Sequence, residues 1–107
     1  MKFENVPELE LKNFKDGEGA LYARMVVDGE NRFMRGRLAP GSSIGMHTHR
    51  GSCEMIYVIG GVGTVIMDGK EERLEPGDYH YCPENHTHSL CNRGTEELVF
   101  FAVVPKQ

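Results

Sequence analysis

Residues 46–54 read MHTHRGSCE, which places His47 and His49 one residue apart and Glu54 five positions after the second histidine. Side chains alternate across a β-strand with period two, so a strand here would present both imidazoles on one face, about 7 Å apart along the backbone. Glu54 is an odd number of residues beyond His49 and would point the other way in an unbroken strand. We expect the chain to turn through Gly51 and bring the Glu54 carboxylate back on an adjacent strand, facing the histidines.

A second pair of histidines with the same spacing lies at His86 and His88. Each pair ends a segment that starts with Pro-Gly, 40-PGSSIGMHTH-49 and 76-PGDYHYCPENHTH-88. This loose internal echo predicts that the two segments form paired halves of one β-sandwich. His88 arrives from the second segment and can add a third nitrogen to the group.

Three imidazoles and one carboxylate form a ligand set suited to borderline divalent ions such as Mn, Fe, Co, Ni, Cu or Zn. No sulfur ligand is required, and Cys53, next to Glu54, is expected to face away from the site. The alternative is a polar turn whose histidines are simply solvated. We favour the metal site, and its predicted ligands are His47, His49, Glu54 and His88.

Short strands account for most of the sequence pattern. The 13 glycines and 5 prolines separate runs rich in Val, Ile, Tyr, Phe and Met. Turn signals recur about every 8–12 residues, which is typical of an all-β domain, and helical spacing of apolar residues is absent. The predicted strands are Ala20–Val27, Arg32–Leu38, Ile44–Thr48, Glu54–Ile59, Gly63–Met67, Lys70–Leu74, Tyr79–Cys82, His88–Asn92 and Leu98–Val104.

Several turns can be assigned from residue type. Asp68-Gly69 is a strong signal for a two-residue hairpin, since both central positions of a type I′ turn need positive φ. Pro40-Gly41 and Pro76-Gly77 mark two further turns. The N-terminal segment VPELELKNF, residues 6–14, is compatible with one helical turn or with a strand at a sheet edge, and its sequence favours neither.

Composition and charge argue against several classes of partner. The net charge is −4 with Lys and Arg scattered, so no basic stripe for nucleic acid is present. No apolar run approaches the roughly 18–20 residues of a membrane span, and the N-terminus lacks a secretory signal. The three cysteines, Cys53, Cys82 and Cys91, have no CxxC spacing. We therefore expect a cytoplasmic protein with reduced thiols.

Two motifs in the chain resemble those of the cupin superfamily. The first has the spacing Gly-x5-His-x-His-x4-Glu-x6-Gly and is matched by Gly41, His47, His49, Glu54 and Gly61. The second is matched by Gly77, Pro83, His88 and Asn92. Cupins commonly have glycine two residues after the proline, where this chain has Asn85. Asparagine tolerates the left-handed region better than most residues, so the turn can survive this departure.

The resemblance implies a fold and a pocket. Cupins are all-β proteins whose double-stranded β-helix, or jelly roll, closes two antiparallel sheets around a pocket. Residues 1–107 would form a single cupin domain with the four predicted ligands inside it. By the same resemblance, Ile44, Phe100 and Ala102 would line a mostly apolar pocket.

Three residues near the motifs have more than one interpretation. His86 lies outside the cupin pattern and is either a fifth ligand, a proton shuttle or, as we favour, a residue turned outward by the turn at Pro83. Arg35 and Arg37 lie on the strand before the first motif. They are either solvated charges on the outer face, which we favour, or one of them binds an anionic substrate.

A metal site of this kind can polarise a carboxylate, lower the pKa of bound water or, with a redox-active ion, activate dioxygen. We favour a small metalloenzyme with dioxygenase-like chemistry on a small organic substrate over an isomerase or lyase, with no catalytic residue assigned. The alternatives are a non-catalytic, metal-dependent ligand-binding or sensor protein and, less favoured, a closed structural metal site. The resemblance also implies a homodimer, because small cupins often pair through exchanged N-terminal strands. The substrate and the native metal are not identified by the sequence.

Overall fold

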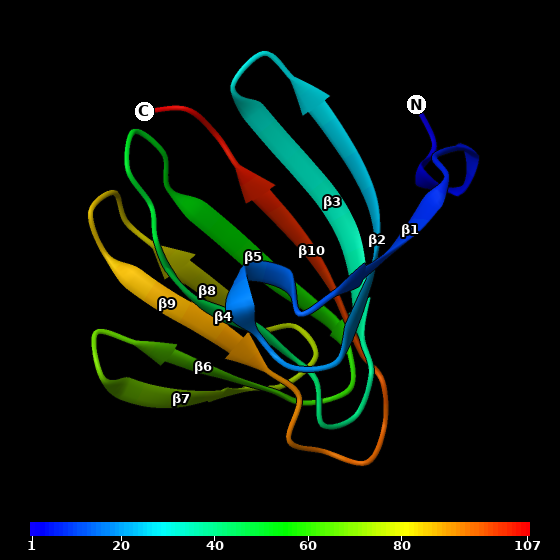
Figure 1. Ribbon diagram of the computed structural model, residues 1–107, viewed down its shortest axis with the longest axis vertical. Helices are drawn as coiled ribbons and strands as arrows, with labels where there is room; N and C mark the ends of the chain where they lie inside the picture. Colours follow the sequence, from blue (N-terminus) through cyan, green and yellow to red (C-terminus); the bar gives the residue numbers. More distant parts are fainter.

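Two antiparallel β-sheets face each other and build the fold (Figure 1). The computed structural model describes residues 1–107. The larger sheet contains, in spatial order, β1 (Glu8–Lys12), β2 (Ala20–Asp28), β3 (Asn31–Leu38), β10 (Leu98–Val104), β5 (Glu54–Gly60) and β8 (Tyr79–Cys82). The smaller sheet contains β4 (Ser43–Thr48), β9 (Thr87–Cys91), β6 (Gly63–Met67) and β7 (Lys70–Leu74). Two 3-10 helices, η1 (Phe3–Asn5) and η2 (Phe14–Asp16), flank β1, and neither is long and apolar enough to span a bilayer.

The all-β prediction is confirmed. Each of the nine predicted strands is present, and no predicted bound differs from the observed one by more than one residue. The structure has one strand more than predicted, β1. It lies at the sheet edge, which was one of the two expectations for residues 6–14. It pairs antiparallel with β2, with Leu9 opposite Ala23.

The inward faces of the two sheets enclose one apolar core of 13 buried residues. Strand alternation selects these residues, because every second side chain of a strand points inward. Phe100 on β10 is fully buried, and its ring lies where a Cβ at Gly36 of the neighbouring strand would come within 2.6 Å of it. Glycine at position 36 therefore makes room for the ring. Burying a side chain of this kind contributes roughly 1.5–3 kcal/mol to stability.

The turn predictions are confirmed by the backbone. Asp68 and Gly69 have φ values of 50° and 81°, as a type I′ hairpin between β6 and β7 requires. Asn85 has a φ of 70°, so asparagine does adopt the left-handed conformation at the position where cupins commonly carry glycine. The hairpin turn joins the paired strands β6 and β7 beside His88, whereas the turn at Asn85 carries the chain from β8 in the large sheet to β9 in the small sheet.

The segment around η2 crosses from the large sheet to the small one and packs against β4 (Figure 1). Asn13, Lys15 and Asp16 all have positive φ, between 51° and 63°, which is uncommon for residues with side chains. The two backbones approach so closely that a Cβ at Gly45 would overlap the Lys15 carbonyl oxygen. A glycine in β4 therefore permits this strained segment to lie against the strand that carries His47.

Candidate metal centre

Two neighbouring strands of the small sheet supply the three predicted histidine ligands. β4 and β9 pair antiparallel, and His47 lies directly opposite His88. The pairing continues past the strand ends, since the His49 N–H donates to the His86 carbonyl oxygen at 3.1 Å. His49 is two residues from His47, so both side chains point to the same inner face. The histidine-bearing ends of the two Pro-Gly segments thus meet in neighbouring strands of one sheet, whereas β8, within the second segment, belongs to the large sheet.

A β-bulge in β4 turns the histidines inward. The register shifts between Ile44, which pairs with Leu90, and His47, which pairs with His88. In a regular strand, positions three apart would face opposite sides of the sheet, but an extra residue in the bulge re-aims the following side chains. Ile44 and His47 therefore share the inner face, while Met46 between them is exposed.

Glu54 comes from the opposite sheet. It is the first residue of β5, is 5% exposed, and precedes Ile56 and Val58 on the same inward face. Gly51, with a φ of 71°, lies in the loop that carries the chain from the small sheet to the large one. The expectation that Glu54 would return on a strand adjacent to the histidines is wrong. It faces them across the interior because β4 and β5 belong to different sheets.

The structure brings the donor atoms of the four predicted ligands together. Glu54 Oε1 lies 2.8 Å from His88 Nε2, 3.0 Å from His49 Nε2 and 3.7 Å from His47 Nε2. His88 Nε2 lies 2.9 Å from His49 Nε2 and 3.2 Å from His47 Nε2. All four ligand atoms lie within 4.8 Å of one another, so the group could hold a metal ion.

The spacing of the donors and the contacts of their Nδ1 atoms fit a divalent cation. Ligand atoms about 2.1 Å from one ion lie about 3.0 Å apart at neighbouring octahedral positions and about 3.4 Å apart in a tetrahedron. Each imidazole is anchored through Nδ1: His47 to the Gly45 carbonyl at 2.7 Å, His49 to the Ser52 hydroxyl at 3.2 Å and His88 to His80 at 2.9 Å. This anchoring leaves three Nε2 atoms directed at one carboxylate oxygen, an arrangement that a cation stabilises.

The charge state of Glu54 suits a ligand role. Burial raises the pKa of the Glu54 carboxyl, but the facing imidazoles of His47, His49 and His88 outweigh burial and hold the pKa well below its ordinary value. Glu54 is therefore an ionised carboxylate at neutral pH. A carboxylate must be ionised to bind a cation well, so the protein supplies this ligand in the required state.

His80 is a buried residue of the site that the sequence analysis did not single out. Its Nε2 lies 2.9 Å from His88 Nδ1, and its side chain is 4% exposed. Burial, assisted by the nearby His88, lowers the pKa of His80 to about 4, so the ring is neutral at pH 7. The strand pattern contained the signal, because His80 alternates with the exposed Tyr79 and Tyr81 on β8. It has no place in the His-x-His spacing, which drew attention away from it.

The four donors open onto a cavity of about 470 Å³. Six of its 19 lining residues are hydrophobic, so the expectation of mostly apolar walls is wrong. Ile44 lines the cavity as expected, whereas Phe100 and Ala102 do not. These two are 0% and 1% exposed in the core instead, because they lie on the central strand β10 beneath the other side chains.

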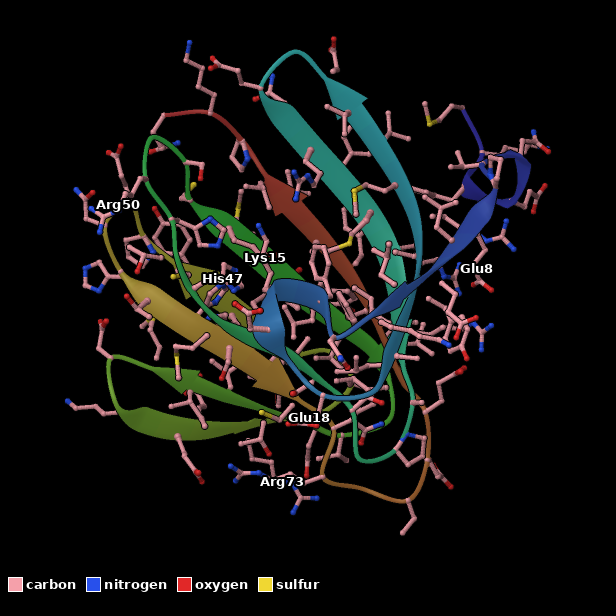
Figure 2. The ribbon with its side chains drawn as sticks, in the orientation of Figure 1. Glu8, Lys15, Glu18, His47, Arg50 and Arg73 are labelled. Atoms are coloured by element: carbon pink, nitrogen blue, oxygen red, sulfur yellow. The ribbon has the colours of Figure 1, made fainter.

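Basic side chains surround this cavity. We call Lys15, Arg32 and Arg50 the cavity cations; none of the three forms a salt bridge. A fourth basic residue, Lys106, pairs with Glu30 at 2.5 Å. Figure 2 shows Lys15 on η2 near His47, and Arg50 on the loop between β4 and β5. The cavity therefore carries a positive charge that the protein itself does not neutralise.

The remaining residues considered from the sequence lie on the outside, as favoured. His86 turns away from the donor group and pairs with Asp68, and this hydrogen bond lowers the pKa of the Asp68 carboxyl. Arg35 is exposed on β3. Arg37 forms salt bridges with Glu8 and Glu97, each at 2.7 Å. Of the arginines on this strand, Arg32, two residues before Met34, lines the cavity, and the sequence did not single it out.

Known proteins resemble this chain in sequence and in structure. The chain is 32% identical to an oxalate-binding protein of Thermotoga maritima over 107 aligned residues, covering 94% of this chain and 88% of that protein. It superposes with a TM-score of 0.92 on a crystal structure from Thermotoga maritima described as a predicted oxalate decarboxylase, at 28% identity and covering 99% and 97% of the two chains.

A third comparison bears on the fold alone. The structure of KdgF from Halomonas sp. superposes with a TM-score of 0.76 at 18% identity, covering 97% of this chain and 90% of that one.

The family model for the cupin domain matches residues 34–104, which include both motifs and all four predicted ligands. With the jelly-roll architecture and this match, the chain belongs to the cupin domain family.

Proposed function

We propose that the protein binds one divalent transition-metal ion through His47, His49, Glu54 and His88 and uses it to hold a small organic carboxylate. The observation that carries the proposal is that the four donor atoms open into a cavity with three unpaired basic side chains. A cation at the donors and the cavity cations together favour an anionic ligand over a neutral one. The relative named as an oxalate-binding protein supports the same class of ligand.

The chain's own residues divide the work of binding. The ion, once bound, would supply a Lewis acid for a carboxylate oxygen. Lys15 and Arg32 add positive charge to the wall of the cavity, while Ile44 and Leu90 provide apolar surface beside the donors. Charged groups interact more strongly where water is excluded, so the apolar side chains strengthen the attraction. The donor set suits Mn, Fe, Co, Ni, Cu or Zn.

We place binding ahead of catalysis because the cavity has few groups that could move a proton. Two acidic residues line it: Glu54, which is in the proposed ligand set, and Glu30, which is paired with Lys106. His86, considered as a proton shuttle, is on the outside with Asp68. General acid or base catalysis needs a titratable group within hydrogen-bond reach of the reacting atom. A binding protein has no such need.

Dioxygenase-like chemistry is the second candidate. It is favoured by the apolar residues next to the donor set, which suit the body of a small organic substrate. A redox-active ion held by three imidazoles and one carboxylate would leave positions open for small ligands. Lyase activity at the same site is supported by the 28% identical structure described as a predicted oxalate decarboxylase, since a decarboxylase is a lyase. Isomerase activity has no separate observation in its favour.

Calorimetry on the metal-loaded protein separates these candidates. We expect oxalate, malonate or glycolate to bind the loaded protein and to bind neither the metal-free protein nor a His49→Ala variant. Oxygen uptake with each compound is measured in parallel, because steady uptake would place the dioxygenase first. If the loaded protein binds none of these carboxylates and consumes no oxygen, the proposed function is wrong.

The assembly, domain organisation and location of the protein are further parts of the proposal. We propose a single domain over residues 1–107 that forms a homodimer in the cytoplasm. The outer face of β5 and β8 supports the dimer, since large apolar patches on a surface often mark interfaces. Its exposed side chains are Met55, Tyr57, Ile59, Tyr79 and Tyr81. Three free cysteines are in keeping with a reducing compartment. Light scattering coupled to size-exclusion chromatography tests the dimer, and a monomer mass would contradict it.

A further inference from the structure

Arg32 differs from the other two arginines on its strand. β3 alternates, so that Arg35 is exposed and Arg37 reaches the outer salt bridges, while Met34 is buried in the core. Arg32 shares the inward parity of Met34 and lines the cavity. It forms no salt bridge, although it is partly buried. A guanidinium partly removed from water without an anionic partner is costly, and a bound anion would relieve that cost.

The strand register places Arg32 level with the donor group. Arg32 pairs with Val104 on β10, and Val103 pairs with Met55 on β5. The same antiparallel register puts Glu54 opposite Val104, and the bridge between Ser52 and Lys106 continues it. Arg32 and Glu54 are therefore two strands apart in one cross-strand row, a separation of roughly 10 Å between backbones. Both side chains point inward from this row toward the same cavity.

We infer that Arg32 determines ligand specificity by holding the second carboxylate of a dicarboxylate whose first carboxylate lies at the donor group. The inference rests on the proposed function and narrows it from carboxylates in general to dicarboxylates. The planar guanidinium donates two parallel N–H bonds to a carboxylate, a geometry that lysine cannot reproduce. Lys15 and Arg50 add charge to the cavity from a 3-10 helix and a loop. Arg32 is the one cavity cation that lies on a strand, β3 of the larger sheet. It is thus the most firmly placed of the three.

The test compares Arg32→Met with Arg35→Met in the metal-loaded protein. Both variants remove one arginine from the same strand, but Arg35 is on the outer face and serves as the matched control. Metal content is measured first, because both variants should retain the full metal complement of the unmodified protein. Calorimetry then gives the affinity for oxalate and malonate, which carry two carboxylates, and for glycolate, which carries one.

For Arg32→Met we expect the affinity for oxalate and malonate to fall about 10- to 100-fold, as for a lost charged hydrogen-bond pair. Glycolate affinity should change no more than it does in Arg35→Met. Arg32→Lys should recover only part of the dicarboxylate affinity. The inference is overturned if dicarboxylate affinity is unchanged in Arg32→Met, or if glycolate affinity falls by the same factor. Failure of the unmodified loaded protein to bind any of these compounds would instead contradict the proposed function, and the inference with it.

Discussion

His80 Nε2 lies 2.9 Å from His88 Nδ1, so a buried, neutral imidazole supports the ring of a proposed metal ligand from behind. With His88 Nε2 directed at the donor group, its Nδ1 carries the proton and donates to His80. Replacing His80 by leucine would remove the acceptor and leave that N–H buried without a partner. We expect metal affinity to fall roughly 10- to 100-fold, the usual effect of removing such a partner. Competition with a chromophoric chelator measures it.

The matched variants for this prediction are His80→Gln and His86→Gln. Glutamine at position 80 can still accept a hydrogen bond, so part of the affinity should return. His86 pairs with Asp68 on the surface, and its replacement should leave metal affinity unchanged. Equal affinities for His80→Leu and the unmodified protein would show that His88 needs no support from His80.

Metal removal should lower the melting temperature without unfolding the protein. A ligand that binds only the folded state stabilises it by about 4 kcal/mol when present at 1,000 times its Kd. The apolar core of 13 residues does not depend on the donor atoms, so the metal-free protein should stay folded. Scanning calorimetry with and without EDTA measures the shift. His49→Ala should be folded and should show no response to metal. A metal response in His49→Ala equal to that of the unmodified protein would speak against the assigned ligands.

Gly45→Ala should destabilise the protein, because the new Cβ would overlap the Lys15 carbonyl oxygen of η2. Forcing an extra carbon into a closely packed place costs about 1–3 kcal/mol, measured as the free energy of unfolding in urea. Gly60→Ala is the control, since a Cβ there meets only Val99 Cβ at 3.9 Å. Equal stability of the two variants would contradict this prediction, because it would show that the contact between η2 and β4 accepts an added Cβ.

The salt bridge from Glu8 to Arg37 should make stability depend on pH in the acid range. A hydrogen bond from Arg37 lowers the pKa of Glu8 below 4.5 in the folded protein. A carboxyl whose pKa is lower when folded stabilises the fold fully above its unfolded pKa, and this stabilisation is lost as the pH falls through the folded pKa. Glu8→Gln should therefore be less stable than the unmodified protein near pH 6, and the difference should shrink near pH 3.

The pH dependence of Glu8→Gln is measured by urea unfolding at the two pH values. Both side chains are partly exposed, so added salt should reduce the effect. Glu10→Gln is the control, because Glu10 lies on the same strand and forms no salt bridge. A difference between Glu8→Gln and the unmodified protein that is constant across this pH range would contradict the account.

Much of the fold could be predicted because turn chemistry and strand alternation are local properties. The turns at Asp68-Gly69 and at Asn85 can be predicted because these residue types tolerate positive φ. The edge strand β1 was ambiguous because it is short and mostly exposed. Its five residues alternate between polar and apolar, but a segment of this length does not separate an edge strand from one helical turn. Its place beside β2 is a tertiary contact, and the salt bridge of Glu8 with Arg37 on β3 is a second one.

The clustering of His47, His49, Glu54 and His88 could be predicted from the sequence, but the arrangement of the strands that carry them could not. The His-x-His spacing fixes a shared face for His47 and His49, whereas the sheet that carries Glu54 depends on how the whole chain winds. The bulge in β4 is invisible to strict alternation, yet it sets which residues face inward. Strand alternation places Arg32 and His80 on inward faces, but no local motif contains them. Their roles arise from contacts with strands that are distant in sequence.

The most direct test of the central claim is anomalous diffraction from a crystal of the protein loaded with manganese or zinc. The account predicts a single strong peak about 2.0–2.3 Å from the Nε2 atoms of His47, His49 and His88 and from a carboxylate oxygen of Glu54. An anomalous peak at another place, or an ion that is not coordinated by His88, would contradict the account.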